Sequence, residues 1–186
     1  MRARADSAAA TADRVVAATI RLFPTMPWDD LTLGAIAEAA GVTVQTVIRR
    51  FGSKDGVYRA AVERVTASVT EQRAQAPVGD VAAAVANLVD HYETTGDIAM
   101  HLLRQELGVP VIAETTTFGR RLHADWVERV FAPWLDAARG AARKRLCAQL
   151  VAVCDVYTWH LLRRQGDLSR AATEASIRQL VEGVLP

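Results

Sequence analysis

Apolar residues recur at helical spacing in two short segments that a single glycine separates. In the first segment, residues 33–40, they stand at the i, i+3, i+4 and i+7 positions, and Thr32 has the side chain of a good N-cap. Gly41 can adopt the left-handed conformation that ends a helix, and Thr43 can cap the next helix two residues later. The pattern therefore predicts two short helices, 33–40 and 44–51, joined by a tight turn.

The same periodicity extends over most of the chain. A helix is expected before Pro24, and a long one from Ser53, its N-cap, to about residue 76. Pro133 is expected to kink a later helix. The expected breaks between later helices are Gly96, Gly108, Gly140 and Gly166. The later helices are predicted at residues 79–95, 97–107, 115–139, 141–165 and 169–185. We therefore predict an all-α protein with little or no strand.

Composition agrees with this prediction and limits the possible partners. Hydrophobic residues make up 51% of the chain and aromatic residues only 6%, with alanine, leucine and valine dominant, which favours helices over a sheet. The formal net charge is +1, so binding to nucleic acid would need a local basic cluster. Residues 43–64 contain five basic and two acidic side chains, a local net charge of +3.

The helix predicted at 141–165 is apolar nearly all round between Leu146 and Leu162. A helix that is apolar on two faces needs two packing partners. One face can serve the domain's own core and the other a second copy, although burial inside one monomer is the alternative. The last helix has one apolar stripe and could complete a four-helix dimer interface. The residues expected at this homodimer interface are Leu150, Cys154, Tyr157, Leu161, Ile177, Leu180, Val181 and Val184.

A helix, a glycine turn and a short second helix form a helix-turn-helix unit, whose second helix can lie in the major groove of DNA. Val47 points inward in this arrangement. Lys54, at the start of the following helix, can meet a phosphate. The outward face then consists of Val44, Gln45, Thr46, Ile48 and Arg49, a mixture suited to base edges and thymine methyl groups. The structural alternative is a helix pair with no role in DNA binding.

The stretch LTLGAIAEAAGVTVQTVIRRFGSKDGVY, residues 31–58, resembles the TetR family of bacterial transcriptional regulators. The resemblance implies base-reading positions at Val44, Gln45 and Ile48 and phosphate contacts at Thr46 and Lys54. Two departures stand out. Ile48 replaces the tyrosine that most members carry. Arg50 replaces the usual histidine or tyrosine and can restore a phosphate contact, which predicts an altered operator preference. The complete set of expected DNA-binding residues is Thr43, Val44, Gln45, Thr46, Ile48, Arg49, Arg50 and Lys54.

The resemblance also implies the domain organisation and the function. We expect a helix-turn-helix DNA-binding domain at residues 1–58 and a helical ligand-binding and dimerisation domain at 59–186. The implied function is that of a cytoplasmic homodimeric regulator, in the family's usual form a repressor on a palindromic operator of double-stranded DNA. It would be released by a small, mainly apolar effector. The alternative function is a small-molecule binding bundle without a DNA role.

Polar and aromatic residues on the later helices are the candidates for effector recognition. A buried carboxylate such as that of Asp155 is costly unless paired, so this residue faces solvent, forms a salt bridge or recognises a ligand. The other helices can surround a bundle pocket. The complete set of candidate ligand-binding residues is His91, Tyr92, His101, Gln105, His123, Trp126, Asp155 and Trp159.

Other classes of function find no support in the sequence. The sequence lacks the Glu-x-x-His spacing of a di-iron bundle, a pair of histidines at i and i+4, a glycine-rich phosphate loop and a G-x-S-x-G motif. We therefore expect no metal, no cofactor and no enzyme activity. Cys147 and Cys154 lie too far apart on a helix for a disulfide. The sequence has no apolar run long enough for a membrane span.

Overall fold

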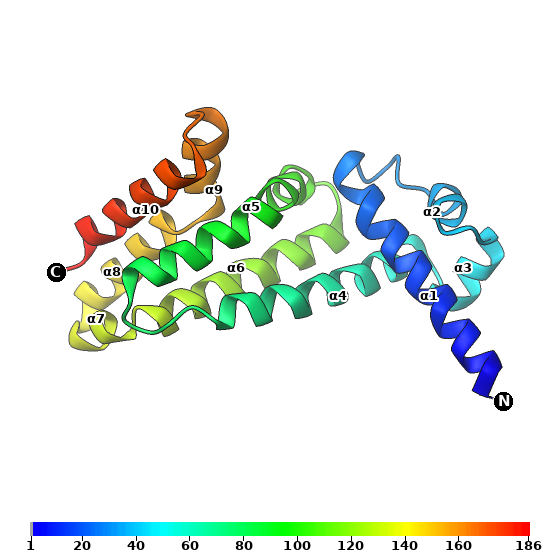
Figure 1. Ribbon diagram of the computed structural model, residues 1–186, viewed down its shortest axis with the longest axis horizontal. Coiled ribbons are helices and arrows are strands. Elements are labelled where there is room, and N and C mark those ends of the chain that lie inside the picture. Colours follow the sequence, from blue (N-terminus) through cyan, green and yellow to red (C-terminus); the bar gives the residue numbers. More distant parts are fainter. Residues whose placement is uncertain (1) are drawn as a thin grey trace. The chain divides into compact units, whose positions relative to one another are not determined.

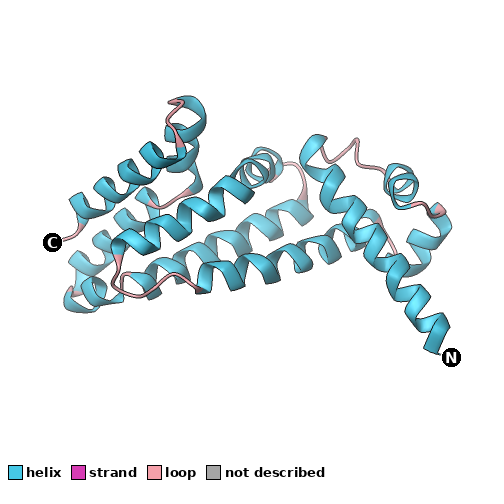
Figure 2. Cartoon of the chain, in the orientation of Figure 1, coloured by secondary structure: helices cyan, strands magenta, loops and turns pink. Residues whose placement is uncertain are grey.

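The computed structural model describes the backbone of residues 2–186 and the side chains of residues 9–186. Within these residues the chain consists of helices joined by loops, so the predicted all-α fold class is confirmed (Figure 2). The helices gather into two compact units. Unit 1 contains the residues up to Ala67 together with Gln105–Ala113, and unit 2 contains Ser68–Arg104 and Glu114–Pro186.

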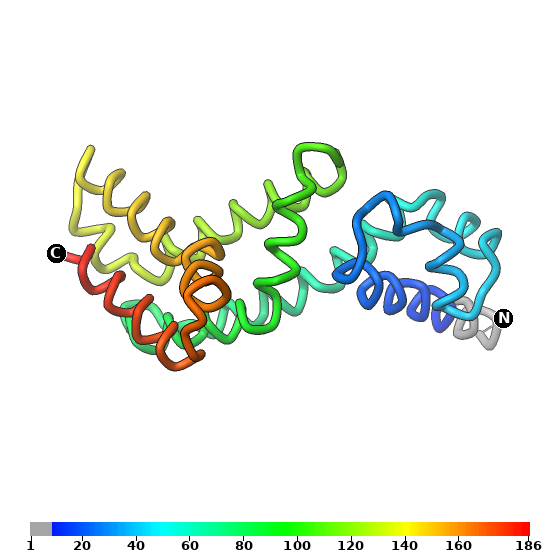
Figure 3. Tube along the Cα trace, turned by 90° about the horizontal axis from the view of Figure 1, so that it is seen from above, coloured from blue at the N-terminus to red at the C-terminus, as the bar shows by residue number. Residues whose placement is uncertain are grey.

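Unit 1 is built on the three N-terminal helices and the first part of the fourth. These elements are α1 (Arg2–Leu22), the short 3-10 turn η1 (Phe23–Thr25), α2 (Leu33–Ala40), α3 (Val44–Phe51) and the start of α4 (Lys54–Ala74). Helix α1 packs against α2, and α2 packs against α3 (Figure 3). Tyr58 supports this unit from α4, because its ring lies 5.2 Å from the ring of Phe23 and 5.2 Å from that of Trp28. The core includes the fully buried side chains of Val15, Leu31, Ile36, Val47 and Val57.

Unit 2 contains the end of α4 and, apart from Gln105–Ala113, which belong to unit 1, the later helices of the chain (Figure 1). These are α5 (Val81–Gln105), α6 (Pro110–Val130), α7 (Ala132–Ala137), α8 (Gly140–Val153), α9 (Val156–His160), the π-helical turn η2 (Leu161–Gln165) and α10 (Arg170–Val184). Their inner faces form one apolar core, and α10 packs against α8. The largest fully buried side chain of this core is Trp159.

The predicted break at Gly96 is wrong, because α5 runs without interruption through this residue. Gly96 instead allows a close approach between two helices. A Cβ atom added at Gly96 would lie 2.4 to 2.8 Å from three carbons of the Trp159 ring. The absence of a side chain at this position therefore makes room for Trp159, and this contact is invisible to a search for local helix breakers.

The predicted continuous helix at 141–165 is also wrong. Helix α8 ends at Val153, and the chain turns at Cys154 before α9 begins at Val156. Asp155 caps α9, since its Oδ1 atom accepts a hydrogen bond of 2.9 Å from the backbone N–H of Tyr157. An acidic side chain within an apolar run thus marks a helix start, because its carboxylate satisfies an N–H group that the helix leaves unpaired.

Pro133 was expected to kink a helix over residues 115–139, and the structure shows a break just before it. Helix α6 ends at Val130, and Pro133 lies in the first turn of α7. A proline in the first turn costs no backbone hydrogen bond, because the N–H groups there have no intrahelical acceptor. Proline therefore starts a new helix here.

Charged and polar groups attach α5 to α9 and η2. Glu93 Oε1 accepts hydrogen bonds of 3.0 Å from Trp159 Nε1 and 3.0 Å from Arg163 Nε. Burial acts to raise the pKa of Glu93, but the hydrogen bonds from Arg163 and Trp159 outweigh it and the net pKa is lowered. Arg164 forms a second ion pair with Asp97 at 2.9 Å. Together these contacts hold the π-helical turn against α5.

The predicted boundary between residues 58 and 59 remains a prediction about independently folding domains. Helix α4 contributes to both units, since its residues up to Ala67 belong to unit 1 and those from Ser68 belong to unit 2.

Among the described residues, no helix is long and apolar enough to cross a membrane.

Replacing Gly96 by alanine should destabilise the protein, because the new methyl group would overlap the Trp159 ring. Overpacking of this kind costs about 1–3 kcal/mol of unfolding free energy, measured here by urea or thermal denaturation. Gly119→Ala is the matched control, because a Cβ at this position of α6 meets nothing within 4 Å. Alanine there should leave stability unchanged or raise it by up to about 1 kcal/mol. Equal melting behaviour of the two variants would contradict the assigned role of Gly96.

Candidate functional site

The turn between α2 and α3 is set by local hydrogen bonds. Thr32 Oγ1 accepts from the N–H of Ala35 at 3.1 Å and so caps α2. Gly41 has φ 64° and ψ 43°, in the left-handed region, and the N–H of Val42 donates to the carbonyl of Ala37 at 3.0 Å. Thr43 then caps α3 by accepting from the N–H of Thr46 at 3.2 Å. One helix thus closes and another opens within three residues, as the sequence predicts.

Two arginines of α1 hold the end of α2. Arg14 Nε donates to the carbonyl of Ala40 at 3.2 Å, and Arg21 donates to the carbonyl of Ala39 at 3.4 Å. The last carbonyl groups of a helix have no intrahelical donor and carry partial negative charge, so cations stabilise them. These two arginines therefore fix the orientation of α2, and through its turn the position of α3.

Helix α3 presents a mixed polar and apolar face to solvent. Val47 is fully buried against the unit 1 core, whereas 39% of Val44 and 38% of Ile48 is exposed. Thr46 is half-buried, and its hydroxyl lies 2.9 Å from that of Thr43. The remaining predicted DNA-binding residues on this element are also exposed, namely Thr43, Gln45, Arg49 and Arg50. This face has the composition needed to contact base edges and phosphates.

Lys54 is half-buried and has contacts within unit 1 that the sequence does not suggest. Its Nζ atom donates to the carbonyl of Trp28 at 2.7 Å and stands 4.2 Å from the centre of the Trp28 ring. An ammonium group has three donors, so two remain for other acceptors. Lys54 thus ties the start of α4 to the turn before α2.

The structure brings several predicted effector residues together in unit 2. The ring of Tyr92 lies 5.1 Å from that of His91 and 5.9 Å from that of Trp159. The Tyr92 hydroxyl donates to the carbonyl of Cys154 at 3.0 Å. His123 and Trp126 form a second, stacked pair, with ring centres 6.3 Å apart.

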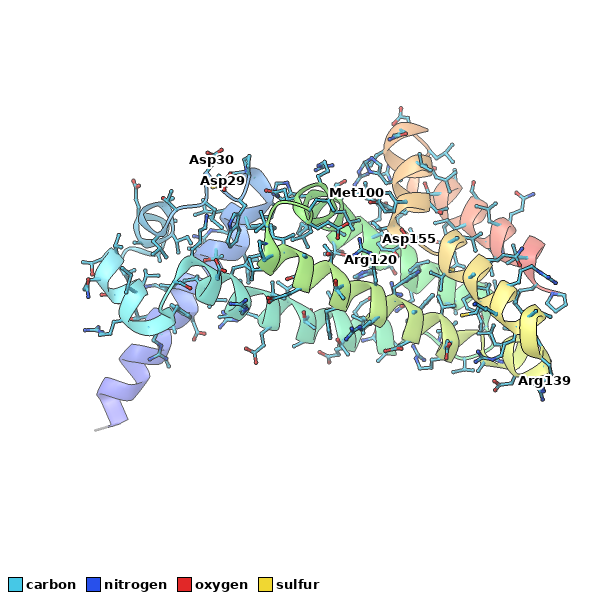
Figure 4. All side chains as sticks on the ribbon, turned by 180° about the vertical axis from the view of Figure 1, so that it is seen from behind. Asp29, Asp30, Met100, Arg120, Arg139 and Asp155 are labelled. Carbon is cyan, nitrogen blue, oxygen red and sulfur yellow. The ribbon has the colours of Figure 1, made fainter. Side chains whose placement is uncertain are left out.

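Four of the candidates are placed by their own contacts or by their position in the fold. Gln105 belongs to unit 1, where its Oε1 accepts from the backbone N–H of Trp28 at 2.7 Å. Asp155 is occupied in capping α9 (Figure 4), and the indole N–H of Trp159 is bound to Glu93. His101 is half-buried on α5. Gln105 therefore belongs to a different unit from Tyr92 and Trp126, whereas Trp159 contacts Tyr92 and the charge of Asp155 acts on Tyr92 and His123.

The residue that sequence reasoning missed is Arg73, near the end of α4. Only 5% of Arg73 is exposed, and its guanidinium lies 4.2 Å above the Trp126 ring. One of its terminal nitrogens donates to His123 Nδ1 at 3.2 Å. An arginine close to a helix end is ordinarily a surface residue, so its sequence position carries no signal of burial.

The hydrogen bonds of His123 determine which ring nitrogen carries the proton. Nδ1 accepts from Arg73, so the proton lies on Nε2, which donates to the carbonyl of Val151 at 3.1 Å. Burial and the Arg73 charge both lower the pKa of His123. Burial, together with Arg73 and His123, also lowers the pKa of His91 to about 3. Both imidazoles are therefore neutral at neutral pH.

The predicted dimer residues divide into two groups. Tyr157, Leu161 and Leu180 are exposed, Leu161 to 56%, and Val184 is half-buried. The other four pack inside the protomer's own core, and their assignment to a dimer interface stays a prediction. They are Leu150, Cys154, Ile177 and Val181.

Cys147 and Cys154 are both free thiols. Among the described residues, no group of three or more histidine, cysteine, aspartate and glutamate side chains is arranged to hold a metal ion.

Comparison with known proteins agrees with this geometry. Residues 15–61 match the model of the bacterial regulatory proteins of the tetR family. A transcriptional regulator from Rhodococcus sp. Rha1 has the same fold, with a TM-score of 0.72 and 15% identity over 93% of this chain and 95% of that one. The fatty acid degradation regulator FadR from Bacillus halodurans has a TM-score of 0.57 and 16% identity over 91% and 93% of the two chains. No curated protein matches by sequence.

The fold and the exposed face of α3 define a helix-turn-helix protein of the class that regulates transcription by binding DNA. The match over residues 15–61 agrees with the predicted resemblance to the TetR family of bacterial regulators.

Replacing Gln45 by alanine should change which operator sequences bind best, with a loss of about 1–3 kcal/mol of discrimination at one base pair. Lys54→Ala should weaken binding to all sequences alike and reduce the salt slope by about one. Lys144→Ala, in unit 2, removes the other lysine and is the control. The measurement is a set of binding curves on single-base operator variants. A uniform loss of affinity in both test variants would contradict the assigned reading face.

Neutral His91 predicts that stability falls as the pH falls. The pKa of His91 is about 3 in the folded state against an ordinary 6.5, so the unfolded chain binds more protons between these values. The free energy of unfolding therefore has its full contribution from neutral His91 above about pH 6.5. This contribution is lost as the pH falls toward 3, by up to about 1.4 kcal/mol per pH unit. Urea unfolding at a series of pH values should show a smaller slope for His91→Gln. An unchanged slope would mean that His91 takes up its proton as readily in the folded protein as in the unfolded chain.

Proposed function

We propose that this protein is a homodimeric transcriptional repressor that binds a palindromic operator in the bacterial cytoplasm and is released by a small, mainly apolar effector. The observation that carries the proposal is the α3 face, where Gln45 and Arg49 are exposed together with Val44 and Ile48. It combines hydrogen-bonding groups, a positive charge and aliphatic surface on one short helix. These are the groups that read base edges and thymine methyls in a major groove.

Within this proposal, Gln45 reads a base edge, and Val44 and Ile48 contact thymine methyl groups. Thr43, Thr46, Arg49 and Arg50 serve the neighbouring phosphates, which position the helix without reading sequence. Lys54 contributes in two ways. It holds the turn at Trp28 through its carbonyl, and its remaining donors are available for a phosphate.

The exposed apolar residues of α9, η2 and α10 support the proposed dimer. Tyr157, Leu161 and Leu180 present large apolar side chains to solvent, although the adjoining core of unit 2 is well packed. A second copy could cover them by isologous pairing, in which the same surface of each protomer meets. Two reading helices, one from each copy, are what two operator half-sites require.

Helix α4 supplies a possible path for release. Its first residues pack in unit 1 with the DNA-facing helices, and Arg73 near its end packs among the polar residues of unit 2. An effector that displaces Arg73 would act on the same continuous helix that carries Tyr58. Release requires the effector to bind the DNA-free conformation more tightly than the DNA-bound one.

The first experiment is a fluorescence-anisotropy titration of the purified protein against the DNA upstream of its own gene and a scrambled control. Binding should be specific for the upstream DNA and should weaken as salt rises, with a log-log slope of about 0.9 per neutralised phosphate. Equal, weak binding to both DNAs and to sites selected from random DNA would contradict the proposal and favour the small-molecule binding bundle.

Leu161→Arg should prevent dimerisation, because a charged side chain would be buried without a partner in the interface. Sedimentation equilibrium should then show a monomer, and operator affinity should fall at least about tenfold because two half-sites no longer bind together. Val78→Arg is the control, since Val78 is also an exposed apolar residue of unit 2 but lies outside α9, η2 and α10. A dimer that persists in Leu161→Arg would place the interface elsewhere.

A further inference from the structure

The most unusual group in unit 2 is the buried guanidinium of Arg73. Arginine is rarely buried unless it is paired with an acid. Among the described residues, Arg73 has a hydrogen bond to His123 and a ring contact with Trp126, but no ion pair with a carboxylate. Burial lowers the pKa of Arg73, which is the sign of a cation held in an unfavourable environment.

The groups that surround Arg73 are neutral or positive. From α5 come His91 and Tyr92, and burial keeps the first deprotonated and the second protonated. From α6 come His123, which is neutral, and Arg129, whose charge further lowers the pKa of Arg73. Burial also raises the pKa of the Cys154 thiol, to about 12. The region therefore carries excess positive charge.

One carboxylate, that of Asp155, influences this region from the start of α9. It acts to raise the pKa of Tyr92, of His123 and of the Cys154 thiol. Its Oδ1 atom is held by the N–H of Tyr157. Asp155 thus moderates the positive potential. The side-chain hydrogen-bond partners of the Arg73 guanidinium are the neutral His123 imidazole and the Tyr92 hydroxyl.

Two buried donors in this cluster have no acceptor. Arg73 Nε and Trp126 Nε1 are both shielded from solvent and make no hydrogen bond. An unpaired buried donor is costly, and native proteins keep few of them. The two belong to residues in direct contact, since the guanidinium lies over the indole ring. An acceptor that reached both donors would satisfy them and balance the charge.

We propose that the cluster of Arg73, Trp126 and His123 is the recognition site for the carboxylate of a small organic acid with an apolar or aromatic body. This inference rests on the proposed function, because it gives the chemical class of the effector. A carboxylate is a stronger acceptor for guanidinium than a neutral imidazole, so it would take the place of His123 Nδ1 on Arg73. The aromatic rings of Trp126, Tyr92 and His91 would contact the rest of the molecule.

The test uses the full chain without DNA and matched pairs of probes. Butanoate, octanoate, dodecanoate and benzoate are compared with the corresponding primary amides by isothermal titration calorimetry and thermal shift. At least one acid should bind, and its amide should bind roughly tenfold to a hundredfold more weakly, because it lacks the charge-assisted hydrogen bonds. If none of the acids binds, or if acids and amides bind equally, the proposal is overturned.

Variants then assign the binding to these residues. Arg73→Gln should lose the preference for acid over amide while the amide affinity stays unchanged. Trp126→Phe keeps an aromatic face beneath the guanidinium and removes only the N–H donor, so it tests the site even if Arg73→Gln does not fold. Arg121→Gln removes an exposed charge from the same helix and should behave as the wild type. Full acid preference in both Arg73→Gln and Trp126→Phe would overturn the proposal.

A parallel anisotropy titration on operator DNA separates this inference from the function it rests on. Acid binding without any change in DNA affinity would support the carboxylate site and contradict an effector role. Operator binding with no acid binding would support the DNA function and overturn the site. Acid binding that lowers operator affinity, and does so less in Arg73→Gln, supports both.

Discussion

The contact between Trp159 and Gly96 is the constraint on which the arrangement of unit 2 depends. The indole occupies the space that a side chain at residue 96 would fill, and its N–H is bound to Glu93 one turn earlier on α5. Arg163 binds the same carboxylate. One aromatic ring thus fixes α9 and η2 against α5, both by shape and by hydrogen bonding. Such a contact combines close packing with a satisfied buried donor.

Two features of the site depend on this contact. Toward the core of unit 2, Tyr92 on α5 donates a hydrogen bond to the carbonyl of Cys154. Helices α4 and α6 supply Arg73 and Trp126 of the polar cluster. On the outer side the same contact leaves Tyr157 and Leu161 exposed. One packing arrangement therefore includes both the surface proposed for a second copy and the cluster proposed for an effector. The two lie on different sides of α9 and η2.

The protein uses positive charge in two contrasting ways. Arg49 and Arg50 are exposed on α3, where water and phosphates can solvate their charge, and a net charge of +1 leaves such local clusters to determine DNA contact. Arg73 is buried among neutral groups, where the same charge is costly until an anion compensates it. In the function proposed here, the guanidinium on α4 would respond to ligand chemistry, and those on α3 would respond to salt.

The sequence by itself determined the all-α class and the two short helices around Gly41, because each of these depends on interactions within a few residues. It also carried the resemblance of residues 31–58 to the TetR family. Thr32, Gly41 and Thr43 act on neighbouring backbone groups, so their residue types reveal their roles. Only the tertiary structure decided the continuity of α5 at Gly96, the break at Asp155 and the burial of Arg73. These depend on residues far apart in the chain, such as Trp159 and Trp126. A local pattern records helix propensity and capping, whereas the space available to a side chain is set by elements that meet it only on folding.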